Sequence, residues 1–464
     1  MSTSTLNSVL SALGGTTGID VTSAVDTILY ADRAPERGWQ AQQTTLASQT
    51  SAINQIESET SALSDSLNNL SNLDGALSSV TATSSDTSLL SATAVSGTAA
   101  SNHTITINSL ATAASWYSDA ETSSSTALPS GTIAITVGSG TPVDITVGGS
   151  GNPDTLGDLA TYINSQSLGL TANVITDANG ARLALTSSTT GSASDFTVSS
   201  TSSVGFTRSG TAANASLTVD GVPISSASNT VTGAISGVTL NLLGAAPATT
   251  NSSGVVTTAA TTINLSLGPD TDSINTAVSD FVTAYNTLIS DVNTQTGYDT
   301  STQTAGVLQS DSAITGLQSA LLASTNYGSG SGVFQTLDSL GVTTNTDGTL
   351  TLNSTTLASA VQTNSAAVAT FFQGAALNGF ANSVTSSLNI YTDPTQGAFT
   401  VDLQSISNEN TDLTNETSTL ELYLSSQQTI LTAQYNAADI AIQQLPEQIK
   451  QIQALLNPNS NSSS

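Results

Sequence analysis

Apolar residues near both ends of the chain recur every seven positions, and Ser, Thr, Gln and Asn fill most positions between them. Near the amino end the repeat lies on two adjacent lines of a helix, formed by Leu46, Ile53 and Leu67 and by Ile56, Leu63 and Leu70. Near the carboxyl end it comprises Leu424, Leu431, Ala438, Leu445 and Ile452, interleaved with Tyr435, Ile442, Ile449 and Leu456. A stripe this narrow requires a partner helix, because one helix cannot cover it alone. The pattern therefore predicts paired helices at both ends.

A shorter amphipathic helix precedes the first repeat. Asp20 is a suitable N-cap, and one helical face follows it, formed by Val21, Val25, Ile28 and Leu29. Pro35 predicts a break before the long helix, and Pro446 predicts that the last helix does not continue straight. For 46–73 and 406–431, partners inside the chain and in other molecules both remain open. For 21–29 and 424–456 we expect burial against other molecules, because the two prolines would interrupt a continuous internal pairing.

The long middle of the chain alternates apolar and polar residues between turn signals. Strands are predicted at 104–108, 133–137 and 143–147 (a hairpin), 170–175, 182–186, 217–219, 238–243 and 263–267. Residues 186–216 are predicted to be mostly loop, and 249–262 a linker. One helix is predicted to start at 154 and another at the cap Asp272. Shorter helices are predicted at 311–323, 354–373 and 375–390, around a hairpin at 342–352. A returning helix or helix pair is predicted at 401–456.

These elements predict an α+β multidomain fold, in which coiled-coil-like termini and a helical domain enclose two nested β-rich domains. We expect terminal leg segments at 1–41 and 428–464, and a helical core domain with a small β-hairpin at 42–76 and 270–427. An inner β-rich domain is predicted at 77–128 and 245–269, and an outer one at 129–244.

Charge narrows the possible functions. The chain carries 33 acidic and 5 basic residues, a formal net charge of −28, and the basic residues form no cluster. Nucleic acids and anionic membrane surfaces require clustered Lys and Arg, so neither is an expected partner. There is no cysteine, no stretch that could span a membrane and no ordinary cleaved signal peptide, so we expect any export to use another route.

The sequence offers little for catalysis. His103 is the only histidine, so a two-His metal site is excluded and we expect no Ser-His-Asp triad. Turns at Asp177-Ala178-Asn179-Gly180 and Asp347-Gly348 provide oxygens but lack the spaced acids of an EF-hand. We therefore expect no enzyme, no metal site and no cofactor.

Several motifs occur in a fixed order along the chain. Gly18-Ile19-Asp20-Val21 precedes the long repeat helix, and the others lie at 154–164, 170–174, 217–221, 228–231, 237–240, 272–286, 309–311, 340–343 and 347–357. In this order they resemble the flagellar filament cap family, also called hook-associated protein 2, and 154–174 is similar to a motif shared by flagellar hook and cap proteins.

The resemblance implies a structural cap at the distal end of the bacterial flagellar filament, which promotes flagellin folding and polymerisation, prevents monomer loss and in some members adheres to host surfaces. The implied partners are other copies in a small ring, often a pentamer, flagellin, hook–filament junction proteins and an export chaperone on the carboxyl-terminal helix. The implied location is extracellular, without a cleaved signal peptide. The candidate contact residues for oligomer or filament are Val21, Val25, Ile28, Leu29, Leu424, Leu431, Tyr435, Ile442, Ile449 and Ile452.

An alternative function is that of an acidic extracellular adhesin whose β domains bind glycan or mucin. That function requires a cleft lined by exposed aromatic side chains, and aromatic residues make up only 4% of the chain.

Overall fold

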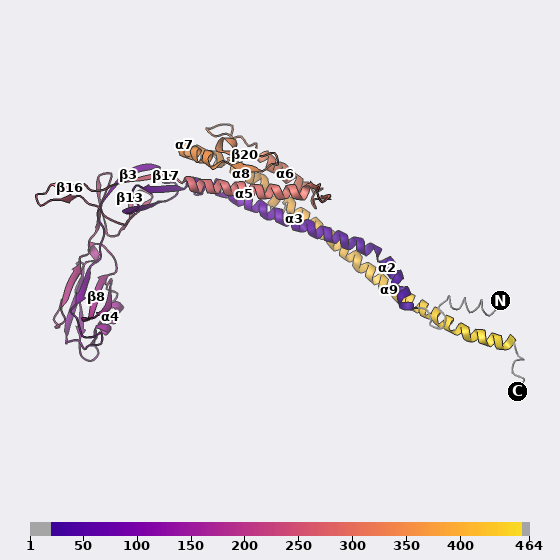
Figure 1. Ribbon diagram of the computed structural model, residues 1–464, viewed down its shortest axis with the longest axis horizontal. Coiled ribbons are helices and arrows are strands. Elements are labelled where there is room, and N and C mark those ends of the chain that lie inside the picture. Colours follow the sequence, from indigo (N-terminus) through magenta and orange to yellow (C-terminus); the bar gives the residue numbers. More distant parts are fainter. Residues whose placement is uncertain (1–19, 457–464) are drawn as a thin grey trace.

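The molecule is elongated, with a helical shaft at one end and two β-rich units at the other (Figure 1). The computed structural model describes residues 20–456. Helices from the two ends of the chain lie side by side along the shaft, and the middle of the chain forms the β-rich units. This arrangement confirms the predicted α+β multidomain class. None of the described helices is long and apolar enough to cross a membrane.

Two successive helices form the amino-terminal side of the shaft. Helix α2 spans Val21–Asp32, and its cap Asp20 accepts a hydrogen bond from the Ser23 amide at 3.0 Å. Helix α3 spans Ala34–Ser71 and carries Pro35 in its first turn. A proline is tolerated there because the first amides of a helix have no internal partner. The break predicted at Pro35 is therefore confined to Arg33, between the two helices.

A helical body surrounds the second half of α3. Its elements are η2 (Ala76–Ser78), α5 (Thr271–Thr296), β18 (Tyr298–Asp299), β19 (Thr304–Ala305), α6 (Ser312–Ser324), η4 (Asp338–Leu340), β20 (Val342–Thr344), β21 (Leu350–Leu352), α7 (Ser354–Gln373), α8 (Phe380–Thr392) and α9 (Ala398–Leu456). The α3 residues Ile53, Ile56, Leu63, Leu67 and Leu70 are fully buried in this body, where α3 packs on α5, α7, α8 and α9. The partners of the first repeat thus lie inside the chain. The cap of α5 is Asp270 rather than the expected Asp272.

Aromatic rings meet at the centre of the helical body. Phe380 is fully buried, and its ring centroid lies 5.4 Å from Phe281, 5.6 Å from Tyr327, 5.8 Å from Phe371 and 5.9 Å from Phe372. Three of these four pairs are edge-on and the pair with Phe371 is stacked, which are geometries that ring quadrupoles favour. The ring of Phe380, on α8, therefore packs against both α5 and α7.

Two carboxyl groups lie close together between α3 and α5. Gln55 donates to Glu59 Oε1 at 2.6 Å and Gln295 donates to Asp291 Oδ1 at 3.1 Å. The other oxygens, Glu59 Oε2 and Asp291 Oδ2, are buried and have no hydrogen-bond partner among the described residues. Burial, with a smaller contribution from the charge of Asp291, raises the pKa of Glu59 above its ordinary value. The folded state therefore favours a protonated Glu59.

We expect Glu59→Gln to raise the melting temperature at pH 7. Because the folded-state pKa of Glu59 is raised, ionisation as the pH rises through that pKa destabilises the folded state, and glutamine removes this cost. The gain should shrink as the pH falls and Glu59 becomes protonated. Thermal unfolding across pH 4 to 8 measures it, with Glu57→Gln as a control that removes an equal charge from the same helix. A Glu59→Gln melting point equal to or below that of the wild type at pH 7 would contradict the prediction.

The inner β-rich unit adjoins the helical body. Its strands are β1 (Val80–Ser84), β2 (Leu90–Ala94), β3 (Ser101–Ser109), β11 (Ala215–Val219), β12 (Val222–Ser226), β13 (Thr230–Ile235), β14 (Val238–Leu242), β15 (Thr249–Thr250), β16 (Val256–Thr258) and β17 (Thr262–Pro269). An antiparallel sheet of order β1-β17-β3-β11-β12 and a second of order β13-β14-β2 share one hydrophobic core. In the first sheet Ile105 lies between Ile263 and Val219, as period-2 alternation predicts.

The outer β-rich unit has its own core. Its elements are β4 (Ser115–Ser118), β5 (Gly131–Val137), β6 (Val143–Val147), α4 (Leu156–Ser165), β7 (Leu170–Asp177), β8 (Gly180–Ser187), η3 (Ser192–Ser194), β9 (Phe196–Ser200) and β10 (Phe206–Gly210). Sheets of order β10-β4-β8-β7 and β6-β5-β9 share this core with the buried face of α4. The hairpin predicted at 133–147 is confirmed. The loop predicted at 186–216 is wrong, because β9 and β10 each pair with a strand 59 or more residues away in the sequence.

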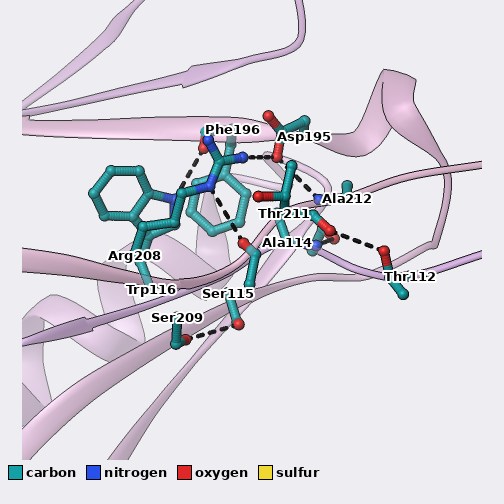
Figure 2. A network of polar contacts seen from close by, with 12 residues as sticks. Thr112, Ala114, Ser115, Trp116, Asp195, Phe196, Arg208, Ser209, Thr211 and Ala212 are labelled. Atoms are coloured by element: carbon teal, nitrogen blue, oxygen red, sulfur yellow. Dashed lines mark hydrogen bonds and ion pairs between the residues drawn. The ribbon is translucent and has the colours of Figure 1, made fainter. Parts of the chain in front are cut away.

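The chain crosses between the two β-rich units twice, and the crossing segments pair with each other. The Thr112 amide donates to the Ala213 carbonyl at 2.9 Å, and its hydroxyl donates to the Thr211 carbonyl at 2.8 Å (Figure 2). Loop contacts add to this junction, since Gly191 donates to the Thr112 carbonyl and Thr190 donates to the Ala227 carbonyl. Several hydrogen bonds therefore connect the outer unit to the inner unit.

An ion pair stabilises the outer side of this junction. Arg208 pairs with Asp195 and lies over the Trp116 ring, 5.7 Å from its centroid (Figure 2). Asp195 also accepts from the Ala212 amide at 3.2 Å, and the Trp116 indole donates to the Phe196 carbonyl at 2.9 Å. The Arg208 guanidinium holds the pKa of Asp195 below its usual range.

The predicted limits of the β-rich domains require correction. Strands β11–β14, at 215–242, were assigned to the outer domain, but they share the core of β2, β3 and β17. Residues 115–128 were assigned to the inner domain, but Leu128 and Trp116 pack in the outer core. The strand order causes the difference, because β11 pairs with β3 across 106 or more residues of sequence. We propose an inner unit at 79–112 and 213–269 and an outer unit at 113–212.

Candidate assembly surface

Helix α2 packs on α9 through a small hydrophobic cluster. Val25, Leu29 and Leu424 are buried, with relative exposures of 2%, 7% and 1%. Partly buried side chains surround them, namely Val21, Leu420, Leu431 and Tyr435. The cluster joins residues from the two ends of the chain and forms the far part of the shaft (Figure 1).

A bidentate ion pair closes this contact at the break between α2 and α3. Arg33 binds both carboxylate oxygens of Glu421 on α9, with Nη2 2.9 Å from Oε2, and also binds Glu36 at 3.0 Å. The hydrogen bonds that Arg33 donates to Glu421 raise the pKa of its guanidinium. This pair was not predicted, although two of the five basic residues, Arg33 and Arg37, lie at the break and mark it as a place where a cation could pair.

The structure corrects the expected partner of the 21–29 segment. Burial against other molecules was expected, but Val25, Leu29 and Leu424 bury one another within the chain. Pro35 does not prevent this internal pairing, because it lies in the first turn of α3 and leaves both α2 and α3 packed on α9. The candidate residue Ile28 is half-buried and outside this cluster.

Beyond the cluster α9 continues as one helix. It spans 59 residues and does not end at Pro446, which lies inside it. From 436 to 452 no side chain is buried. The candidates Ile442 and Ile449 are half-buried, and Ile452 is 55% exposed. The seven-residue phase of Ile442 and Ile449 is kept across the proline, so the seam continues past the point where α2 covers it.

His103 lies in an arrangement that sequence analysis did not expect. Its Nε2 is 3.0 Å from Ser101 Oγ and its Nδ1 is 2.7 Å from Asp220 Oδ2, so the ring bridges Ser101 and Asp220. Asp220 Oδ1 accepts from the Thr104 amide at 2.8 Å, and the His103 hydrogen bond helps to lower the pKa of Asp220. These bonds attach the β11–β12 turn to β3. In the described part of the chain no group of three His, Cys, Asp or Glu residues could hold a metal ion.

Family comparisons agree with this layout. The family models for the N-terminus and the C-terminus of flagellar hook-associated protein 2 match residues 17–114 and 212–447, and that for the flagellin hook IN motif matches 132–189. The two terminal models stop and start at the crossing segments, and the hook IN motif lies wholly within the outer unit.

Individual relatives match over most of their length. The B-type flagellar hook-associated protein 2 of Pseudomonas aeruginosa is 29% identical over 84% of this chain and 86% of its own. The flagellar hook-associated protein 2 of Escherichia coli is 27% identical over 79% and 80%. Among solved structures, the D1, D2 and D3 domains of the flagellar cap protein from Escherichia coli match with a TM-score of 0.57 and 27% identity, over 77% of this chain and 99% of that one.

A paired helical shaft, a helical body and two β-rich units, together with these matches, define a structural cap protein of the bacterial flagellum. The chain belongs to the flagellar hook-associated protein 2 family. This assignment confirms the predicted function at the distal tip of the filament, and it does not favour the glycan-binding adhesin.

Proposed function

We propose that the chain acts as a homo-oligomeric cap whose shaft engages the tip of the filament while the β-rich units form a plate above it. The main support is α9, whose apolar seam continues for about three heptads beyond the cluster with α2. At 1.5 Å per residue, a helix of 59 residues is about 90 Å long, and its last third lies at the far end of the shaft (Figure 1).

The apolar side chains that α9 exposes beyond the cluster favour association with other molecules. Each leucine-sized side chain that becomes fully buried contributes roughly 1.5–3 kcal/mol. Ile442, Ile449 and Ile452 therefore favour helix pairing with another copy or with filament subunits. We propose these three residues as contacts to other molecules, together with the exposed parts of Leu431 and Tyr435, which are only partly buried at the cluster.

The partners follow from this position. Beneath the plate, incoming flagellin folds and adds to the filament, and during assembly the hook–filament junction proteins lie below the cap. The end of α9 is also the segment that an export chaperone would cover, because its exposed seam needs protection before assembly. The assembled cap is extracellular. The copies form a small ring, such as a pentamer.

Electron microscopy of the purified chain, with a truncation, tests this function. The full chain should form small closed rings or plates. Deleting 428–464 should leave the melting transitions of the helical body and β-rich units in place while filament growth is lost in cells that lack their own cap. Deleting only 457–464 is the control and should support longer filaments than the larger deletion. Full-length filaments with the 428–464 deletion would refute the anchoring role of the shaft.

A further inference from the structure

A two-stranded hairpin projects from the inner unit and ends in exposed apolar side chains. Strands β15 and β16 extend away from the rest of the unit (Figure 1), and every residue from 249 to 258 is exposed. Val255 and Val256 are 60% and 57% exposed. The tip is held in shape because the Asn251 amide donates to the Val255 carbonyl at 2.9 Å and the Asn251 side chain accepts from the Val255 amide at 3.0 Å.

A hollow of about 430 Å³ lies at the opposite end of the same unit. Its apolar lining includes Val95, Ile235 and Leu267, and Val95 is 63% exposed. The rest of the lining consists of small residues such as Ser236, with the single histidine, His103, at its edge. The hollow has room for two valine side chains.

The hairpin and the hollow lie at the two ends of β17. This strand begins at Thr262, just after the hairpin, and Leu267, near its other end, lines the hollow. A strand rises about 3.3 Å per residue, so these two residues alone are roughly 17 Å apart. The hairpin also points away from the strand (Figure 1). One chain therefore cannot fill its own hollow with its own hairpin.

The charge distribution favours a second copy as the occupant. With a formal net charge of −28, two copies repel each other over most of their surfaces. Residues 221–269, which include the hairpin, part of the hollow and β12–β17, carry no charged side chain. The two carboxylates that flank this stretch are both engaged, Asp220 by a hydrogen bond with His103 and Asp270 as the N-cap of α5. At this uncharged stretch two copies can approach with little local charge repulsion.

We infer that the β15–β16 hairpin of one copy inserts Val255 and Val256 into the hollow of the next copy, so that each copy uses two different surfaces. A contact of this head-to-tail kind forms a closed ring when its rotation closes. The inference rests on the homo-oligomeric cap proposed above and specifies which surfaces build the ring.

Charged substitutions at the hairpin tip test the contact. Val255→Asp with Val256→Asp should raise the concentration needed for ring formation at least 100-fold in sedimentation velocity, without changing the circular dichroism. Val333→Asp with Val401→Asp is the matched control, because these valines are 65% and 57% exposed on the helical body and the added charge is equal. Unchanged assembly of the hairpin variant, or equal loss in the control, would overturn the inference.

Cysteine cross-linking gives an independent measurement, because the native chain has no cysteine. A mixture of Val256→Cys and Ser236→Cys chains should yield a disulfide-linked heterodimer under oxidation, and a chain with both substitutions should yield a ladder of oligomers. A mixture of Val333→Cys and Ser236→Cys should yield at least tenfold less heterodimer. If rings form but no heterodimer is trapped, the hairpin contact is refuted while the cap function stands. If the wild-type chain stays monomeric at every concentration, the proposed oligomer itself fails.

Discussion

Replacing Leu424 with Asp is expected to release α2 from α9 and to abolish capping, while the helical body and both β-rich units stay folded. Leu424 is 1% exposed and faces Val25 and Leu29. A carboxylate at this position would be buried among aliphatic side chains without a partner, which costs about 3–5 kcal/mol. That cost exceeds what a short helix held by one small cluster can tolerate, so α2 should detach.

Hydrogen exchange of the α2 amides measures this effect directly. In Leu424→Asp, residues 21–32 should lose most of their protection, and filament length in complemented cells should fall to that of cells without a cap. Leu422→Asp is the matched control, because Leu422 is 76% exposed on the same helix and receives the same charge. It should preserve both α2 protection and filament length.

Two results would contradict this prediction. Full protection of α2 in Leu424→Asp would mean that the cluster does not hold the helix. Loss of α2 protection with normal filaments would mean that a docked α2 is not needed for capping.

Replacing Phe380 with Ala is expected to have the largest effect on stability. Truncating a buried phenylalanine costs about 3–5 kcal/mol through lost transfer energy and the cavity that remains. Phe380 contacts four other rings, and each ring pair adds roughly 0.5–1.5 kcal/mol beyond burial, so the cost should lie at the upper end of that range. The loss should fall on the helical body, because the β-rich units have separate cores.

The two tryptophans separate these transitions. Trp39 lies in α3 and Trp116 in the outer unit, so a Trp39→Phe background leaves Trp116 as the reporter of the outer unit. In that background Phe380→Ala should shift the far-UV helical transition in urea and leave the fluorescence transition unchanged. Tyr423→Ala, which removes a 54% exposed ring from α9, is the control. A shift of the Trp116 transition as large as the helical one would contradict independent cores.

Helices and turns were predicted well because their signals are local. The cap Asp20, the seam from Ile53 to Leu70 and the hairpin at 342–352 all depend on neighbours within a few residues. The strands at 196–200 and 206–210 were missed because small polar residues surround them, and their stability comes from distant partners such as β5 and β4.

The candidate contact residues show the same division. The sequence selected the apolar seams at both ends of the chain, and six of those residues form one cluster. It misassigned the partner of Val25 and Leu29, because periodicity shows that a face needs covering but not what covers it. The Arg33–Glu421 pair joins residues 388 positions apart, and although the basic residues at the break mark Arg33, nothing local identifies Glu421 as its partner.

The sequence by itself determined that α2 follows the cap Asp20, which helical faces are apolar and, through ordered motifs, the family. Only the tertiary structure decided that α2 pairs with α9, that β11–β14 belong to the inner unit, that His103 bridges Ser101 and Asp220, and that a hairpin and a hollow occupy opposite ends of β17. The physical reason is range. Backbone and capping preferences act over one or two turns of the chain. Packing joins segments that lie far apart in the sequence, and the pattern of apolar and polar residues does not say which distant segments will meet.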